Sequence, residues 1–132
     1  MVKMMKAQIE DAPILLQIQK EAFIKYAKKY GDFESNPYHM DLHRMEFNIK
    51  YRYGQYYKIL DEKSLEMIGG IFCFELDEKP IMKIAQFYFK NGYQHLGYGT
   101  YVLNELFRLN ENVKTWYVDT ICLLYTSDAA DE

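Results

Sequence analysis

This sequence has few cysteines, no excess of basic residues and no long apolar runs. Its two cysteines, Cys73 and Cys122, are far apart and fit no metal-binding spacing, so we expect neither a disulfide nor a metal site. A formal net charge of -3 provides no basic excess for a phosphate backbone, which argues against nucleic acid as a partner. No stretch approaches the roughly 20 apolar residues of a membrane span or forms a secretion signal, so we expect no membrane association and a cytoplasmic location.

The composition is typical of one globular domain. The chain has 132 residues, of which 49% are hydrophobic and 27% charged. Aromatic residues make up 17%, and side chains of that size either pack in a core or line a ligand cleft. We therefore expect a single core with amphipathic elements around it.

Hydrophobic periodicity predicts helices and strands along residues 1–121. Asp11 is expected to cap the first helix, with Pro13 in its first turn and the apolar positions Ile14, Leu15 and Ile18 facing the core. In chain order the predicted elements are a strand (2–9), two helices (12–30 and 38–53), three strands (56–60, 67–76 and 81–89), a helix (99–109) and a strand (113–121).

Connection lengths predict how these strands pair. Short turns join the three middle strands, so they should be antiparallel. The unit from Ile81 to Ile121 should be a right-handed crossover between parallel strands. Gly69 and Gly70, inside a predicted strand, indicate a bulge or the close approach of another backbone. The expected fold class is α/β (α+β), with a mixed, mostly antiparallel sheet and helices on both faces.

The turn from Gln94 to Thr100, between a strand and a helix, has the features of an anion site. Gly97 and Gly99 allow backbone N–H groups to turn toward one anion without interference from a Cβ atom. The following helix points its positive end at the same place. The turn lacks the Lys-Ser/Thr of a P-loop and the third glycine of a dinucleotide fingerprint, and taken alone it is also compatible with a plain tight loop.

The segment from Phe87 to Thr100 resembles the acyl-CoA-binding segment of GNAT acyltransferases. The family pattern is an apolar strand end, a short loop containing an aromatic residue, then Gln/Arg-x-x-Gly-x-Gly/Ala and a helix. Gln94, Gly97 and Gly99 match its fixed points, and the order of elements over residues 1–121 agrees with the family fold. The resemblance implies an N-acetyltransferase that moves an acetyl group from acetyl-CoA to a primary amine by direct attack.

The resemblance also implies roles for individual residues. The turn would bind the CoA pyrophosphate through main-chain N–H groups, and the strand end would bond the pantetheine arm and polarise the thioester through its backbone. Tyr38 and His39 would line the amine side. The residues implied in cofactor binding are Phe87, Tyr88, Phe89, Gln94, His95, Leu96, Gly97, Tyr98, Gly99 and Thr100.

The catalytic residues are less clearly indicated by the resemblance. Lys83 stands where many relatives carry the glutamate that serves as the catalytic base, so Glu75 on the neighbouring strand is a substitute for it. Asp119 would orient the amine or anchor the next segment. Two alternatives stay open: a non-catalytic acyl-CoA-binding or regulatory domain of this fold, and an interaction module without a cofactor. The acceptor, a small-molecule or peptide amine, is not specified, and self-association as a homodimer stays open.

The last residues, 122–132, look foreign to the family. They resemble the in-frame translation of a transposon adapter used for sequencing libraries. Family members normally continue past the strand at 113–121 with a helix and two strands. We therefore expect an incomplete acetyltransferase domain at 1–121, followed by a non-native tail at 122–132. We expect the enzyme to be inactive in this truncated form.

Resequencing tests this expectation about the tail. Reads of the locus from unfragmented DNA should show different codons after about Ile121, because an adapter is joined only during library preparation. Genomic reads that reproduce the codons of residues 122–132 would contradict it.

Overall fold

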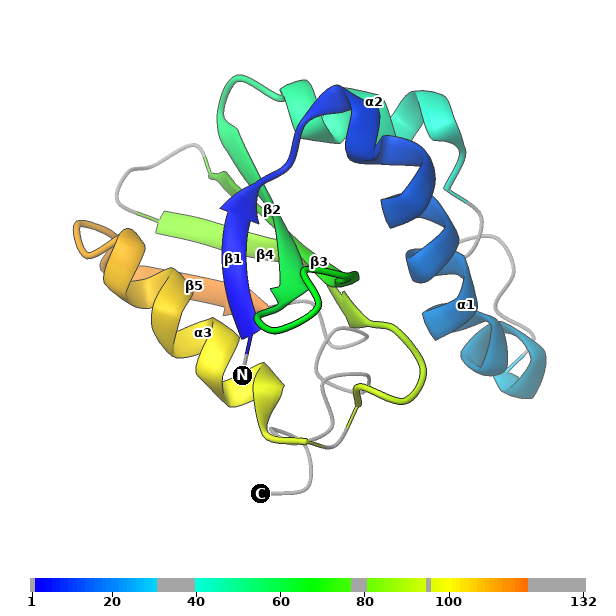
Figure 1. Ribbon diagram of the computed structural model, residues 1–132. Helices are drawn as coiled ribbons and strands as arrows, with labels where there is room; N and C mark the ends of the chain where they lie inside the picture. Colours follow the sequence, from blue (N-terminus) through cyan, green and yellow to red (C-terminus); the bar gives the residue numbers. More distant parts are fainter. Residues whose placement is uncertain (1, 31–39, 77–80, 95, 119–132) are drawn as a thin grey trace.

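The computed structural model describes residues 2–30, 40–76, 81–94 and 96–118 (Figure 1). Its order of helices and strands confirms the predicted order. The elements are β1 (Val2–Lys6), the short 3-10 helix η1 (Ile9–Asp11), α1 (Ala12–Tyr30), α2 (Leu42–Lys50), β2 (Gly54–Asp61), β3 (Met67–Glu75), β4 (Ile81–Phe89), α3 (Tyr98–Leu109) and β5 (Thr115–Val118).

The strands form one sheet in the order β1-β2-β3-β4-β5. The predicted pairings are confirmed, since β2, β3 and β4 are antiparallel, each to the next, and β4 and β5 are parallel. Strand β1, whose partner was not predicted, pairs antiparallel with β2. Helices α1 and α2 cover one face of the sheet and α3 covers the other (Figure 1). The predicted mixed, mostly antiparallel sheet with helices on both faces is therefore confirmed.

Asp11 has a different role from the predicted helix cap. Gln8 is the N-cap of η1, and its backbone N–H donates to Asp11 Oδ2 at 2.7 Å. The same oxygen forms an ion pair with Lys58 Nζ on β2 at 3.0 Å. Asp11 therefore fastens the entry of α1 to the sheet, because the chain makes an extra turn before the helix proper begins.

Helix α2 is shorter than the predicted 38–53, and residues 31–39 lie outside the described part. Asp41 caps it by accepting the N–H of Arg44 at 2.8 Å, so within the described residues the helix starts after Asp41. Only part of the apolar face of this helix is buried. Met45 is buried, whereas Leu42 and Phe47 are 41% and 54% exposed. Ile14 on α1 is likewise half exposed, since only a narrow stripe of each helix reaches the sheet.

The core on the α1/α2 face is built around a buried tyrosine. Tyr88 packs edge-on against Phe23 with ring centroids 6.3 Å apart, and its hydroxyl hydrogen-bonds the hydroxyl of Tyr56. Burial raises the pKa of Tyr88 well above its ordinary value, so the hydroxyl stays neutral. Its ring fills the layer between the sheet and α1.

Gly69 and Gly70 on β3 make room for this tyrosine. A Cβ at Gly69 would overlap the Tyr88 carbonyl oxygen, and one at Gly70 would lie 2.5 Å from the Tyr88 hydroxyl. The pairing of β2 with β3 also shifts register beside Gly69, between Ile59 and Leu60. Both a bulge and a close approach are present, which confirms the prediction from the glycine pair.

Gly69→Ala should destabilise the fold. The added methyl overlaps backbone rather than a movable side chain, so we expect a loss of about 1–3 kcal/mol in the free energy of unfolding. Urea unfolding measures it. Gly92→Asn is the control, because nothing lies within 4 Å of that Cβ position and asparagine tolerates its φ of +94°. Equal midpoints for Gly69→Ala and the parent chain would contradict the close approach.

Candidate functional site

A β-bulge divides β4 into two halves. Phe72 on β3 pairs with Gln86, whereas the next residue, Cys73, pairs with Ile84, so Ala85 is the extra residue. The side chains of Ile84 and Phe87 both pack in the cluster on the α3 face, and Ala85 packs against the cluster on the opposite face. Side-chain alternation is thus reset at the bulge, as an inserted residue requires.

The described pairing of β4 with β5 ends at the same point. The pairing runs from Ile81 with Thr115 to Ile84 with Val118, the last described residue of β5. In the described part of the chain, the second half of β4 has no strand on this side. Among the described residues, the bulge therefore marks the start of an open strand edge.

The open edge presents the backbone groups of Phe87 and Phe89. Lys90 N–H donates to Ile68 C=O on β3 at 2.7 Å, so by antiparallel alternation Tyr88 and Gln86 also bond toward β3. The N–H and C=O groups of Phe87 and Phe89 then point away from β3. In agreement, the Phe89 carbonyl accepts a hydrogen bond from Gln94 Nε2 at 3.1 Å.

Beyond β4 the chain makes a turn and enters α3 through a left-handed glycine. Gly97 is the N-cap, with φ of +81°, and being a glycine it has no side chain with which to cap the helix. Nothing lies within 4 Å of the position of its missing Cβ, so the backbone conformation, not space, favours glycine. The first-turn N–H groups of α3 have no intrahelical partners and carry the positive end of the helix dipole.

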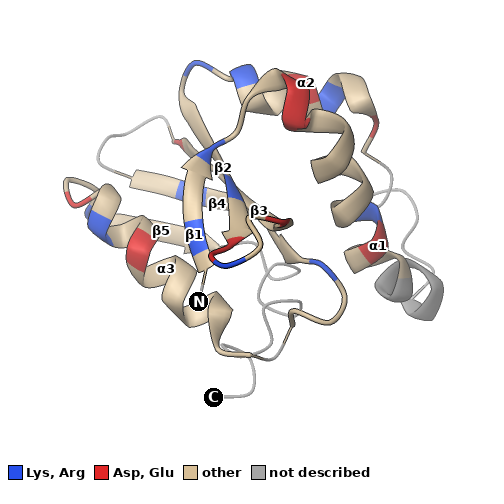
Figure 2. Cartoon of the chain, in the orientation of Figure 1, with Lys and Arg blue, Asp and Glu red and all other residues tan. Residues whose placement is uncertain are grey.

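An anion at this helix start would be bound by backbone groups. The first turn of α3 contains no acidic residue, and the start of this helix is coloured as uncharged in Figure 2. Lysine, arginine and acidic residues are instead interspersed over the described elements (Figure 2). A phosphate would therefore meet N–H groups and the dipole, as in other helix N-terminal anion sites.

The structure brings the two predicted halves of the cofactor site together. Phe87 and Phe89 have buried side chains in the α3-face cluster, and Tyr88 is buried on the other face, so these residues can offer a ligand only backbone groups. Gln94 joins this strand end to the turn. Of the remaining predicted residues, Leu96, Gly97 and Thr100 are exposed, Tyr98 is half-buried and Gly99 is buried, whereas His95 lies outside the described residues.

The predicted catalytic and amine-side residues are not brought to this edge within the described part. Glu75 ends β3 opposite Met82, beside the half of β4 that is paired with β5. Lys83 likewise precedes the bulge and pairs with Tyr117. Asp119, Tyr38 and His39 lie outside the described residues, so their roles stay predictions.

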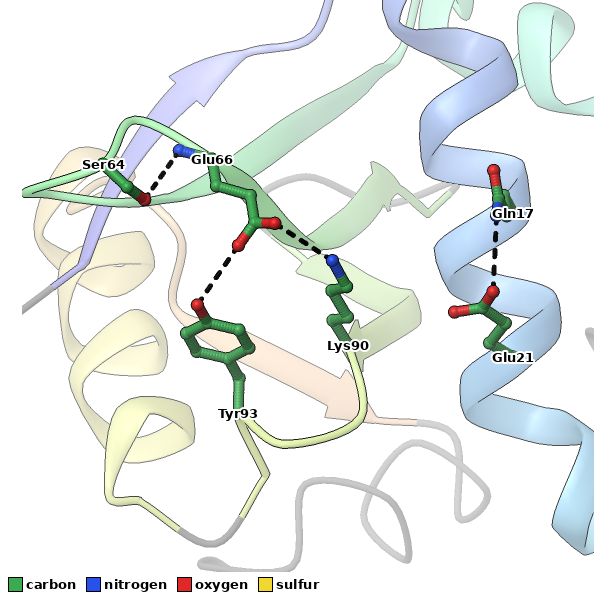
Figure 3. A network of polar contacts seen from close by, with 6 residues as sticks. All are labelled: Gln17, Glu21, Ser64, Glu66, Lys90 and Tyr93. Carbon is green, nitrogen blue, oxygen red and sulfur yellow. Dashed lines mark hydrogen bonds and ion pairs between the residues drawn. The ribbon is translucent and has the colours of Figure 1, made fainter.

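Sequence reasoning missed two polar residues that the structure distinguishes. Gln86 adjoins the bulge, and within the described part of the chain its buried Oε1 has no hydrogen-bond partner. An amide within the mostly apolar run from Ile84 to Phe89 was the available signal. Glu66 binds both Lys90 and Tyr93 beside the turn (Figure 3), and no local pattern announces contacts that span 24 and 27 residues.

The described ranges contain no group of three or more His, Cys, Asp or Glu side chains placed to hold a metal ion. Among the same residues, no helix has the length and apolar character needed to cross a membrane.

Comparison with solved structures identifies the fold. A tetramutant of the BH1408 protein from Bacillus halodurans matches with a TM-score of 0.74 and 13% identity, over 89% of this chain and 81% of that one. The PaiA N-acetyltransferase from Thermoplasma acidophilum, in complex with coenzyme A, matches with 0.65 and 16%, over 84% and 72%. An aminoglycoside acetyltransferase from an uncultured soil metagenomic sample, in complex with sisomicin, matches with 0.63 and 14%, over 89% and 76%.

At these identities the likeness establishes the GNAT fold that the sequence predicted, and it establishes the fold alone. No family model and no curated protein matches the sequence.

Replacing Gln86 tests its unpaired oxygen. Gln86→Met keeps the side-chain length and removes a buried, unsatisfied acceptor, so the free energy of unfolding should rise by about 1 kcal/mol. Gln55→Met is the matched control and should lower it, because Gln55 Nε2 donates to Asn110 Oδ1 at 3.0 Å. If urea unfolding shows equal losses for both variants, Gln86 is satisfied after all.

Proposed function

We propose that this chain is an N-acyltransferase that transfers an acetyl group from acetyl-CoA to a primary amine. The observation that carries the proposal is the edge of β4 that is open within the described residues, which begins at the Ala85 bulge and leads to the start of α3 at Gly97. Extended amide-containing ligands add to such edges as an extra strand would, and pyrophosphates bind at helix starts. One molecule that has both parts, in this order, is acetyl-CoA.

The backbone of β4 would hold the substrate arm. The N–H groups of Phe87 and Phe89 and the carbonyl of Phe87, which point away from β3, can pair with the two amides of the pantetheine arm. Gln94 already occupies the Phe89 carbonyl, which fixes the strand end where the arm would meet the pyrophosphate. These groups stand in place before the ligand arrives, so binding requires little reordering.

The same edge would support the chemistry. An N–H near the bulge would donate to the thioester carbonyl and polarise it. The neutral amine forms the N–C bond, the C–S bond breaks, and the thiolate leaves with its electron pair while a base takes the amine proton. We propose Asp119, which directly follows β5 in the sequence, or Glu75 at the end of β3 as this base.

Direct attack on the thioester is favoured over an acyl-cysteine route. Cys73, the cysteine in the described part of the chain, is buried in the sheet. Burial raises the pKa of its thiol to about 12, so it stays protonated at neutral pH and is a poor nucleophile.

A second candidate function is acyl-CoA binding without catalysis. The position of Glu75 beside the paired half of β4, and of a lysine at Lys83, favours it. Release of CoA from acetyl-CoA in the presence of primary amines would distinguish the enzyme from the binding domain. Aminoglycosides, polyamines and peptide N-termini are suitable acceptors for this assay.

Calorimetric titration of acetyl-CoA tests the proposal. Gly97→Ala should weaken binding roughly tenfold, because an alanine in the left-handed region costs about 1–2 kcal/mol. Gly97→Asn is the control and should bind more nearly like the parent chain, since asparagine adopts this conformation more readily. Failure of the folded parent chain to bind acetyl-CoA would remove both the enzyme and the binding-domain function.

A further inference from the structure

The end of the β2–β3 hairpin contacts the turn that leads into the proposed cofactor loop. Figure 3 shows Glu66, the residue before β3, reaching this turn with both carboxylate oxygens. Oε1 accepts from Lys90 Nζ at 3.0 Å, and Oε2 accepts from the Tyr93 hydroxyl at 3.2 Å. Each oxygen is thus committed to one end of the same turn.

The turn that Glu66 holds is a tight one. Tyr93 N–H donates to Lys90 C=O at 3.0 Å, and Gly92 between them has φ of +94°. These are the features of a type II turn with glycine at its third position. Because Lys90 and Tyr93 are its first and fourth residues, one carboxylate bound to both sets the direction in which the chain leaves toward Gln94.

Glu66 is itself held in place by the hairpin. Asp61 Oδ1 accepts the N–H groups of Lys63 and Ser64 at 2.9 and 3.2 Å, and Asp61 N–H donates to Glu66 C=O at 2.9 Å. The N–H of Glu66 donates to Ser64 Oγ at 3.1 Å. The backbone on both sides of the carboxylate is therefore fixed.

Leu65, next to Glu66, adopts a costly conformation. Its φ of +62° places a bulky residue in the left-handed region, and its side chain is 59% exposed, so little packing compensates for the strain. Such strain persists where the surrounding structure demands it, and it concentrates at functional sites. Here its consequence is that the next residue, Glu66, faces the turn.

Helix α1 gives the turn little support from its other side. A cavity of about 360 Å³ lies between α1 and the ion pair, lined by Ile14, Gln17, Ile18, Glu21, Glu66, Met67 and Lys90. The polar pair Gln17 and Glu21 stands across it on α1 (Figure 3). Support for the turn therefore comes from the hairpin and from the Gln94 bond to β4.

We infer that Glu66 is a positioning residue for the nucleotide end of acyl-CoA, acting through the Lys90–Tyr93 turn without touching the ligand. The inference rests on the proposed function. It explains why a carboxylate is placed close to an expected anion site, where simple repulsion would weaken binding. The charge of Glu66 is balanced by Lys90, and its contacts orient the turn that leads to Gly97.

The ion pair between Glu66 and Lys90, together with the bond from Tyr93 to Glu66, forms a clamp on the turn, and the pair is ionised at neutral pH. The hydrogen bond from Lys90 lowers the pKa of Glu66, and Glu66 in turn raises the pKa of Lys90. A carboxyl group with a lowered pKa contributes its stabilisation above its ordinary titration range and loses it as the pH falls through the lowered value. Assays near neutral pH therefore test the intact clamp.

The test compares two variants that each remove one negative charge. Glu66→Gln should weaken acetyl-CoA binding roughly three- to tenfold, as expected when an exposed, charge-assisted pair is lost. Glu105→Gln is the matched control, because it breaks the exposed ion pair with Arg108 later on α3. Charge repulsion alone predicts unchanged or tighter binding of the anionic ligand in both variants. For Glu66→Gln, positioning and repulsion therefore predict changes in affinity of opposite sign.

A second variant separates positioning from folding. Tyr93→Phe removes only the hydroxyl that Glu66 accepts and should also weaken binding, and the double variant should lose less than the product of the single effects. Melting temperatures should stay near that of the parent chain. S-acetyl-pantetheine, which lacks the nucleotide, should bind the parent and Glu66→Gln equally.

Two results would overturn the inference and leave the proposed function intact. One is that the parent chain binds acetyl-CoA and Glu66→Gln binds it with equal or higher affinity. The other is an equal loss for acetyl-CoA and S-acetyl-pantetheine. A folded parent chain that does not bind acetyl-CoA would instead overturn the proposed function, and the role of Glu66 with it.

Discussion

The β-bulge at Ala85 is the constraint on which the rest of the site depends. A regular β4 would keep one side-chain alternation along its whole length, so Ile84 and Phe87 would face opposite sides of the sheet. The extra residue resets side-chain alternation after Ile84, and pairing with β5 is described only as far as Val118. Phe87 and Phe89 then keep buried side chains while their backbone groups face outward.

The free edge is useful only because the other side of β4 is held rigidly. Gly69 and Gly70 let β3 approach Tyr88 closely, and the tyrosine ring is fixed between the sheet and α1. Gln94 ties the end of the strand to the following turn. Open hydrogen-bonding groups on a fixed support are the arrangement that minimises reordering when a ligand binds.

Local patterns were sufficient to predict most of the framework. The strand at 81–89 was predicted with the bounds that β4 has, and the glycines at 97 and 99 mark the start of α3. The pairing of the last four strands followed from connection lengths, whereas the place of β1 beside β2 was not predicted. These features depend on neighbouring residues and on backbone conformations that glycine permits, which is why a single sequence reveals them.

Features decided by distant partners were not predicted. Asp11 was expected to cap α1, but its carboxylate pairs with Lys58, 47 residues later in the chain. The extent of α2 was overestimated because periodicity does not reveal that Asp41 starts the helix. The contacts of Glu66 with Lys90 and Tyr93 appear only once the hairpin and the turn are adjacent in space.

The central claim is that acetyl-CoA binds through backbone groups of β4 and of the α3 start. Amide hydrogen exchange, measured with and without acetyl-CoA, tests it most directly. The account predicts slower exchange at Phe87, Phe89 and the first-turn amides Tyr98, Gly99 and Thr100, with little change at Tyr88, whose N–H already bonds to β3. Protection that spares these amides, or that spreads evenly over the sheet, would contradict it.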